Sequence, residues 1–132
     1  MPMIQLIYAS RPFGFDEGTL AAILLVARRC NERDGITGAL ICRGDLYLQL
    51  LEGPEELVDA AFRRIERDLR HLDIKLLSRR PVTERLFPGW AMRHDPARSW
   101  MWTQAEVNAG AVERATEAEA VAIFERLARE PA

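Results

Sequence analysis

The sequence has few cysteines, no long hydrophobic run and no excess of charge of one sign. Neither Cys30 nor Cys42 lies in a spacing typical of a metal site, so we expect a reduced, cytoplasmic chain. No signal peptide is evident, and the longest apolar run, residues 20–27, is far shorter than the ~20 residues of a membrane-spanning helix. The net charge of −2 provides no electrostatic surface for nucleic acid. We therefore expect a soluble intracellular protein that binds neither membranes nor nucleic acid.

The glycine pattern G-x-G-x-x-G is also absent, so a phosphate cradle of the dinucleotide-binding type is not expected. The 132 residues are enough for one domain, and a hydrophobic fraction of 48% is enough to form its core. The sequence changes in character near residue 95. We therefore expect a main domain over residues 1–95 and a helical extension over residues 96–132.

Hydrophobic periodicity predicts the element order β-α-β-β-α-β-β, followed by two shorter helices. The expected strands are 3–10, 36–42, 46–52, 74–78 and 85–93, and the expected long helices are 16–33, capped by Asp16, and 54–71. Capping-box patterns at Thr103 and Thr116 predict the two C-terminal helices.

This order predicts an α+β, ferredoxin-like fold with a mixed five-stranded sheet and both long helices on one face. Right-handed crossovers place the first and third strands side by side in the middle of the sheet. The opposite face then presents Ile7, Leu46, Leu48 and Leu50, and we expect the C-terminal helices to cover it.

Gln49 interrupts an otherwise apolar strand, and alternation places it on the face opposite Leu48 and Leu50. A buried amide without partners costs about 1–3 kcal/mol. An amide also carries donors and an acceptor, and it exchanges their positions when it rotates. Gln49 is therefore a candidate for reading the polar edge of a ligand.

On the predicted fold, Tyr8 is the neighbour of Gln49, Asn31 ends the apolar stripe of the first helix, and Arg64 and Asp68 border that of the second. A flat apolar ligand with a hydrogen-bonding rim fits such a convergence. Each residue also has an ordinary interpretation. Tyr8 is then core packing, Asn31 a helix cap, and Arg64–Asp68 a surface ion pair.

The sequence resembles the BLUF family, bacterial blue-light sensors that use FAD. The similar segments are 6–10 (LIYAS), Asn31 with 35–40 (GITGAL), 49–54 (QLLEGP), 64–71 (RIERDLRH) and 87–92 (FPGWAM). They lie in the family's order and extend from about residue 3 to residue 93. The resemblance implies the family's fold, and FAD as cofactor, with FMN or riboflavin as substitutes because no phosphate cradle is present.

The resemblance also implies roles for single residues. Tyr8 matches the photochemically active tyrosine, and Gln49 matches the switch glutamine that links the phenol to the N5 and O4 edge of the flavin. Trp90 and Met92 match the pair on the last strand, one of which lies near the glutamine and couples the pocket to the sheet.

Further residues match the flavin-binding positions. The resemblance implies that Asn31 binds the carbonyl edge of the ring, and that Arg64 and Asp68 bind the opposite part of the pyrimidine ring. Leu24 on the first helix and His71, which follows Arg70 at the end of the second helix, complete the candidate set.

Two residues depart from the family's pattern on the helix that lines the ring. Ala27 stands where many members carry a hydroxyl group, and Cys30 precedes Asn31 where histidine, arginine or asparagine is frequent. We expect these residues to affect the spectrum and the recovery rate.

The resemblance predicts a short, stand-alone blue-light photoreceptor. Light would rearrange the hydrogen bonds of Tyr8 and Gln49 with a reversible red shift, and the C-terminal helices or the sheet would signal to an unidentified protein partner. We also expect a homodimer or a higher homo-oligomer. The alternative is a flavin-free interaction module on the same fold.

An enzyme is not expected. An acylphosphatase-like hydrolase would need an anion-binding loop after the first strand, and residues 11–15 contain an arginine without a glycine-rich cradle. A flavin redox enzyme would need an open substrate face, and neither a His/Cys nucleophile nor a metal cluster supports one.

Overall fold

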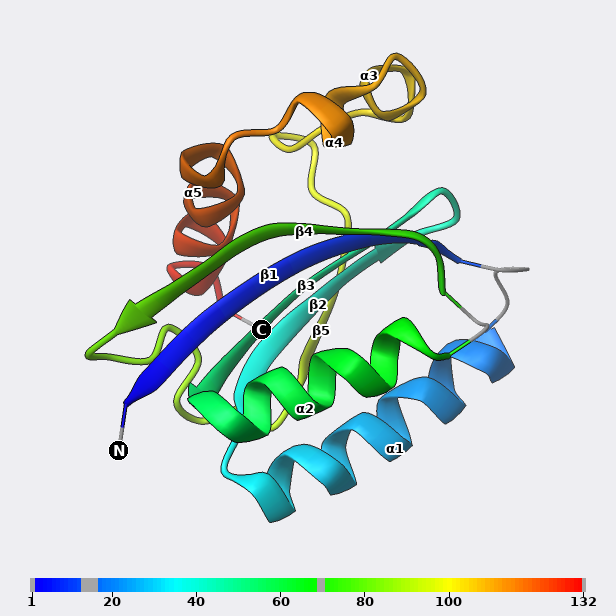
Figure 1. The fold of residues 1–132 in the computed structure, drawn as a ribbon. Helices are drawn as coiled ribbons and strands as arrows, with labels where there is room; N and C mark the ends of the chain where they lie inside the picture. Colours follow the sequence, from blue (N-terminus) through cyan, green and yellow to red (C-terminus); the bar gives the residue numbers. More distant parts are fainter. Residues whose placement is uncertain (1, 13–16, 69–70, 132) are drawn as a thin grey trace.

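The computed structural model describes residues 2–12, 17–68 and 71–131 and is built on one mixed five-stranded sheet (Figure 1). The strands are β1 (Met3–Pro12), β2 (Thr37–Arg43), β3 (Leu46–Pro54), β4 (His71–Val82) and β5 (Arg93–Pro96). Their order across the sheet is β4-β1-β3-β2-β5, and only β2 and β5 pair in parallel. The predicted central position of the first and third strands is confirmed.

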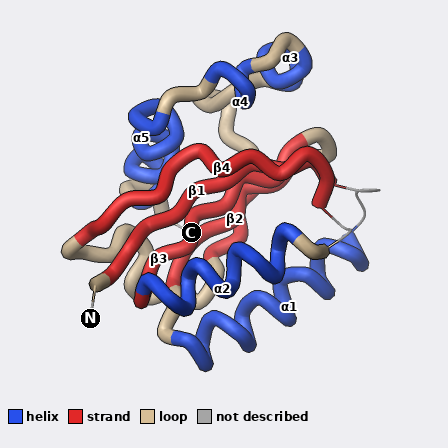
Figure 2. The backbone as a smooth tube through the Cα atoms, in the orientation of Figure 1, coloured by secondary structure: helices blue, strands red, loops and turns tan. Residues whose placement is uncertain are grey.

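Helices cover both faces of this sheet (Figures 1 and 2). The long helices α1 (Glu17–Asp34) and α2 (Glu55–Glu66) lie side by side on one face. The C-terminal helices α3 (Gln104–Asn108), α4 (Ala111–Arg114) and α5 (Glu117–Ala128) lie on the other. The predicted ferredoxin-like α+β fold is confirmed, with α4 as an additional short helix.

Alternation along the strands divides the apolar side chains between two cores. The core under α1 and α2 includes Ile4, Leu6, Tyr8, Leu24, Tyr47, Leu51, Val58 and Met92. The core under the C-terminal helices includes Ile7, Leu46, Leu48, Leu50, Phe87, Phe124 and Leu127, with Trp100, Trp102 and Val121 packed against it. The C-terminal helices therefore cover the sheet face that the sequence left apolar.

Two glycines fix the path of the chain from α1 into the hairpin. Gly35 has a φ of +68°, a left-handed conformation that commonly ends a helix, and Ile36 N donates to Asn31 O at 2.9 Å. Gly38 lies in β2 where a Cβ atom would come within 1.9 Å of the Leu50 carbonyl oxygen. Only glycine therefore lets β2 approach β3 this closely.

The second long helix is shorter than predicted. It ends at Glu66, and the amides of Arg67 and Asp68 donate to carbonyls three residues earlier, which tightens the last turn. The prediction that this helix reaches His71 is wrong, because His71 is the first residue of β4. Asp68 consequently lies in the turn after α2 and not on the face of the helix.

The predicted strand over residues 85–93 is also wrong. Residues 83–92 connect β4 to β5 without regular structure, and β5 begins only at Arg93. Pro88 and Gly89 interrupt the segment, and side-chain hydrogen bonds hold it in place of a strand ladder.

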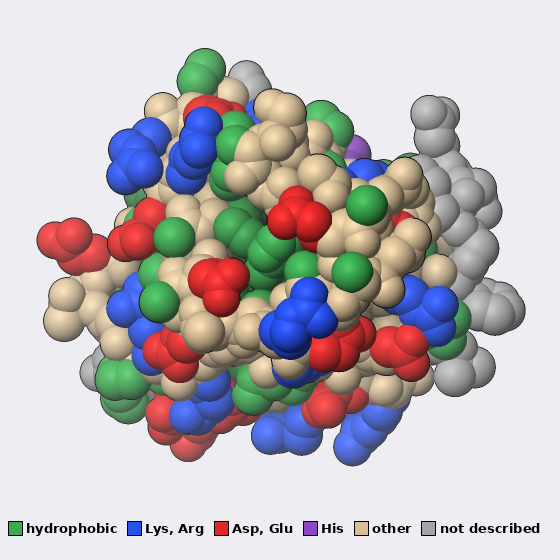
Figure 3. Space-filling view, turned by 90° about the horizontal axis from the view of Figure 1, so that it is seen from above, with side chains coloured by type: hydrophobic (Ala, Val, Ile, Leu, Met, Phe, Trp, Pro, Cys, Tyr) green, Lys and Arg blue, Asp and Glu red, His purple; other side chains and the backbone are tan. Residues whose placement is uncertain are grey.

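Both C-terminal capping boxes are present, at Thr103 and Thr116. Two residues named in the sequence predictions, Asp16 and Arg70, lie outside the described residues. Among the helices that the structure describes, none combines the length and the apolar character needed to span a membrane. The face seen from the side of the C-terminal helices carries charges of both signs around a central patch of hydrophobic side chains (Figure 3).

Candidate functional site

Tyr8 and Gln49 form a direct cross-strand pair between β1 and β3. Both side chains are buried on the face covered by α1 and α2. The Tyr8 hydroxyl donates a hydrogen bond to Oε1 of Gln49. The sheet register therefore places the two predicted photoactive residues in contact.

The phenol of Tyr8 lies in a fully buried, partly aromatic environment. Phe62 of α2 and His71 of β4 approach its ring at centroid distances of 5.5 and 6.1 Å. Burial raises the pKa of Tyr8 far above its ordinary value, and the nearby Asp68 and Tyr47 raise it further. The phenol is therefore held in its protonated form, as a donor to Gln49.

The amide of Gln49 makes its second contact with the segment that leads into β5. Its Nε2 donates to Sδ of Met92 at 3.3 Å. Trp90, two residues earlier, is 43% exposed, and its carbonyl accepts from the Gly38 amide at 3.0 Å. Of the two residues predicted to approach Gln49, Met92 is the one in contact.

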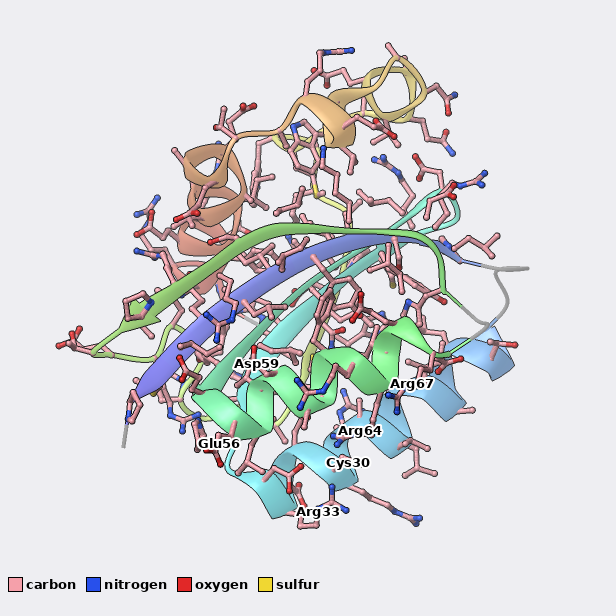
Figure 4. The ribbon with its side chains drawn as sticks, in the orientation of Figure 1. Cys30, Arg33, Glu56, Asp59, Arg64 and Arg67 are labelled. Carbon is pink, nitrogen blue, oxygen red and sulfur yellow. The ribbon has the colours of Figure 1, made fainter. Side chains whose placement is uncertain are left out.

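A cavity of about 160 Å³ lies between α1, α2 and the sheet, next to this amide. Figure 4 shows Cys30 and Arg64 on the two neighbouring helices that form its walls. Most of the lining is apolar, with a smaller polar set. The lining residues are Ile23, Val26, Ala27, Cys30, Asn31, Gln49, Leu51, Ala61, Arg64, Ile65, Asp68 and His71.

Five predicted binding residues thus line one cavity: Asn31, Gln49, Arg64, Asp68 and His71. Leu24 belongs to the adjacent core, whereas its neighbour Ile23 lines the cavity together with Val26 and Ala27.

Asn31 joins the cavity wall to the β4–β5 connection. Its Nδ2 donates to the Ala91 carbonyl oxygen at 2.7 Å. One turn earlier on α1, Arg28 donates from Nε and Nη2 to the Met92 carbonyl oxygen at 3.2 and 3.1 Å. Helix α1 therefore holds the backbone of the residue that contacts Gln49.

Arg64 of α2 forms an ion pair with the neighbouring helix. Its Nη2 lies 3.6 Å from Asp34 at the end of α1. This pair joins the two helices beside the cavity.

His71, the first residue of β4, also lines the cavity. Its Nδ1 is 2.9 Å from the Ser10 hydroxyl, and its ring meets that of Tyr47 edge-on at 5.3 Å. Sequence reasoning missed Ser10 and Tyr47 as neighbours of the site, although the alternation that placed Tyr8 and Gln49 on this face places both with them. The sequence holds no comparable signal for Arg28.

The arrangement suits a flat, conjugated ligand with polar groups at one edge. Aliphatic side chains from α1 and α2 provide the flat walls, while amides, a guanidinium and a carboxylate provide the rim. The buried phenol and the rotatable amide lie at one end. In such a site, the phenol and the amide can exchange protons and hydrogen bonds with a bound ligand.

Comparisons with known proteins agree with this geometry. The family described as "Sensors of blue-light using FAD" (BLUF) matches residues 3–93. The beta subunit of a photoactivated adenylate cyclase from Euglena gracilis is 38% identical over 74 residues, which are 55% of this chain and 9% of that protein. This chain therefore spans about a tenth of the length of that relative.

Two solved structures are similar over almost the whole chain. BlrB, a BLUF protein in its dark state, shares 32% identity with a TM-score of 0.78, covering 96% of both chains. BlsA in its ground state shares 26% identity with a TM-score of 0.83, covering 98% of this chain and 89% of that one. Because the family match covers more than half of the residues of this chain, the chain belongs to the BLUF family of blue-light sensors.

Proposed function

We propose that this blue-light sensor binds FAD in the cavity between α1, α2 and the sheet, and that Tyr8 and Gln49 are its light-driven switch. The contact that carries the proposal is the buried hydrogen bond from the Tyr8 hydroxyl to Gln49, next to a cavity with a polar rim. As a member of this family, the chain is a flavin-binding sensor, and we propose that it acts by sensing and not as an enzyme.

The residues of the cavity fit the ring system of a flavin. Ile23, Ala27 and Ile65 provide apolar walls for a flat ring. Asn31 and Arg64 offer donors to the carbonyl oxygens of its pyrimidine part, and Asp68 accepts from its N–H group. His71 would border the ring as part of the cavity lining, and Leu24 would support the wall from the adjacent core.

When bound, the flavin would supply blue-light absorption and an excited state that takes up an electron and a proton. Tyr8 would be the donor of both, because its phenol is protonated and its hydroxyl already donates to Gln49. Gln49 would relay the proton, and after the electron and the proton return to Tyr8 the amide would be left rotated, with its N–H and carbonyl groups exchanged. The change is one or two hydrogen bonds, so it biases an output by a few kcal/mol at most.

We further propose that β5 carries the change to the C-terminal helices. Met92 contacts Gln49, and the next residue, Arg93, donates from Nη1 to the Leu127 and Glu130 carbonyl oxygens. Neighbouring residues of a strand point to opposite faces. A shift of β5 therefore moves side chains on both faces of the sheet together.

Residues 1–95 are then the sensor, and residues 96–132 are the output element. A protein partner or a second copy of the chain fits an output surface with charges of both signs better than nucleic acid does (Figure 3). Both cysteines are free thiols, which is compatible with the cytoplasm.

An absorption spectrum in the dark and under blue light tests the proposal. We expect a yellow protein with a small reversible red shift that is absent in Gln49→Leu. Gln104→Leu, at an exposed amide of α3, is the control and should keep the shift. Release of the pigment by denaturation and chromatography distinguishes FAD from FMN and riboflavin. A colourless protein that does not take up added flavin contradicts the proposal.

A further inference from the structure

A buried carboxylate lies three residues after Gln49 on the same strand. The side chain of Glu52 is 0% exposed and points to the face of the sheet away from the flavin cavity, because residues 49 and 52 lie on opposite faces. Burying a charge is costly unless hydrogen bonds compensate for it. The partners of Glu52 therefore indicate what the charge stabilises.

These partners belong mainly to the β4–β5 connection. Leu86 N donates to Oε1 of Glu52 and Phe87 N donates to Oε2, both at 2.8 Å. The Thr37 hydroxyl also donates to Oε2, at 2.9 Å. No ion pair to this carboxylate is found among the described residues, so backbone amides provide most of its compensation.

Arg85 makes further hydrogen bonds next to the Glu52 carboxylate. It donates to the Thr37 hydroxyl at 2.8 Å, to the Glu52 carbonyl oxygen at 3.1 Å and to the Gly35 carbonyl oxygen at 2.8 Å. Residues 85–87 are thus fixed to β2, to β3 and to the turn that follows α1.

The held segment reaches both faces of the molecule. Its end contacts the switch through Met92, which lies against Gln49. Its middle contacts the output helix through Phe87, whose ring meets that of Phe124 in α5 edge-on at 6.4 Å. Glu52, on the strand that carries the switch glutamine, holds the segment at Leu86 and Phe87, five residues before the Met92 contact.

We propose that Glu52 is a positioning residue of the light switch, which holds the 83–92 segment so that Met92 lies against Gln49. This inference rests on the proposed photosensor function. The substitution Glu52→Gln keeps the size of the side chain but replaces one acceptor oxygen by an NH₂ donor. One of the two backbone amides then faces a donor and loses its partner.

The test is Glu52→Gln, with Glu56→Gln on the exposed surface of α2 as the control (Figure 4). Amide hydrogen exchange in the dark should show about tenfold faster exchange at Leu86 or Phe87, the factor for one lost hydrogen bond to a charged group. After a blue-light pulse, the red shift should decay about fivefold faster, because a looser segment resists the return of Gln49 less. Flavin content should stay unchanged, since Glu52 does not line the cavity.

The outcomes separate the two proposals. A wild-type protein without a light-induced shift defeats the photosensor proposal, and this inference with it. A wild-type protein that responds, together with a variant whose amides stay protected, refutes the hold on the segment alone. Faster exchange with unchanged recovery shows a purely structural carboxylate and also overturns the inference. If Glu52→Gln does not fold, Arg85→Lys loosens the same segment, and the same criteria apply to it.

Discussion

The guanidinium of Arg93 is the group through which β5 contacts the end of α5, so its removal should loosen that helix. The side chain is 4% exposed. It donates to both carboxylate oxygens of Asp95, at 2.8 and 3.3 Å, and to the carbonyl oxygens of Leu127, Glu130 and Pro131. Arg93→Met keeps a chain of similar length and removes all of these bonds.

The expected loss of unfolding free energy in Arg93→Met depends on the partners that Asp95 keeps. Breaking a buried ion pair by removing one partner costs about 3–5 kcal/mol. Asp95 keeps a second partner, because Nη2 of Arg98 lies 2.9 Å from its Oδ1. We therefore expect a loss of stability at the lower end of this range, about 3 kcal/mol. This corresponds to a drop in melting temperature of about 10 °C for a domain of this size.

Urea unfolding of the purified protein measures this cost directly. Arg129→Met, at an exposed arginine just beyond α5, is the control and should change the free energy of unfolding by less than about 0.5 kcal/mol. Hydrogen exchange in the last turn of α5 tests the output route, and any difference between light and dark should disappear in Arg93→Met. A loss of stability below about 1 kcal/mol would refute the reasoning.

Two further predictions concern Tyr8 and Gly38. Because burial raises the pKa of Tyr8, the unfolded chain loses this proton first, and stability should fall as the pH rises above the ordinary value of 10.0. Urea titrations between pH 8 and pH 11 should show a smaller fall for Tyr8→Phe, and equal falls would contradict the burial of the phenol. Gly38→Ala would place a methyl group 1.9 Å from the Leu50 carbonyl oxygen. It should destabilise the protein by more than about 3 kcal/mol in thermal unfolding, whereas alanine at the open Gly44 should cost far less.

The sheet and the pairing of Tyr8 with Gln49 could be predicted because both follow from periodicity. Alternation assigns every second residue of a strand to one face, and the ferredoxin-like order makes β1 and β3 neighbours. The cover of α5 over the opposite face followed in the same way, from the apolar positions that remained.

The positions of His71 and of the 83–92 segment could not be predicted in this way. The apolar stripe of α2 gives no sign that the last turn tightens at Arg67. The predicted helix therefore continues into the first residue of β4. Phe87 and Met92 fall within the predicted strand 85–93, but the structure places both in the irregular connection before β5. Their positions depend on backbone amides that donate to Glu52 and on backbone carbonyls that accept from Asn31 and Arg28, which are all far away in the sequence.

The orientation of the Gln49 amide explains why a small perturbation would be enough to operate the proposed switch. As the chain is folded here, Oε1 accepts from Tyr8 and Nε2 donates to the Met92 sulfur, which is a weak acceptor. A rotated amide would donate to the phenol oxygen, but its carbonyl would then face a sulfur that offers no proton. The two orientations therefore differ by about one hydrogen bond, or roughly 0.5–1.5 kcal/mol. A bound ring that offers or accepts one further hydrogen bond is enough to reverse the preference. The position of Met92, and hence the segment that Glu52 holds, then sets the balance of the switch.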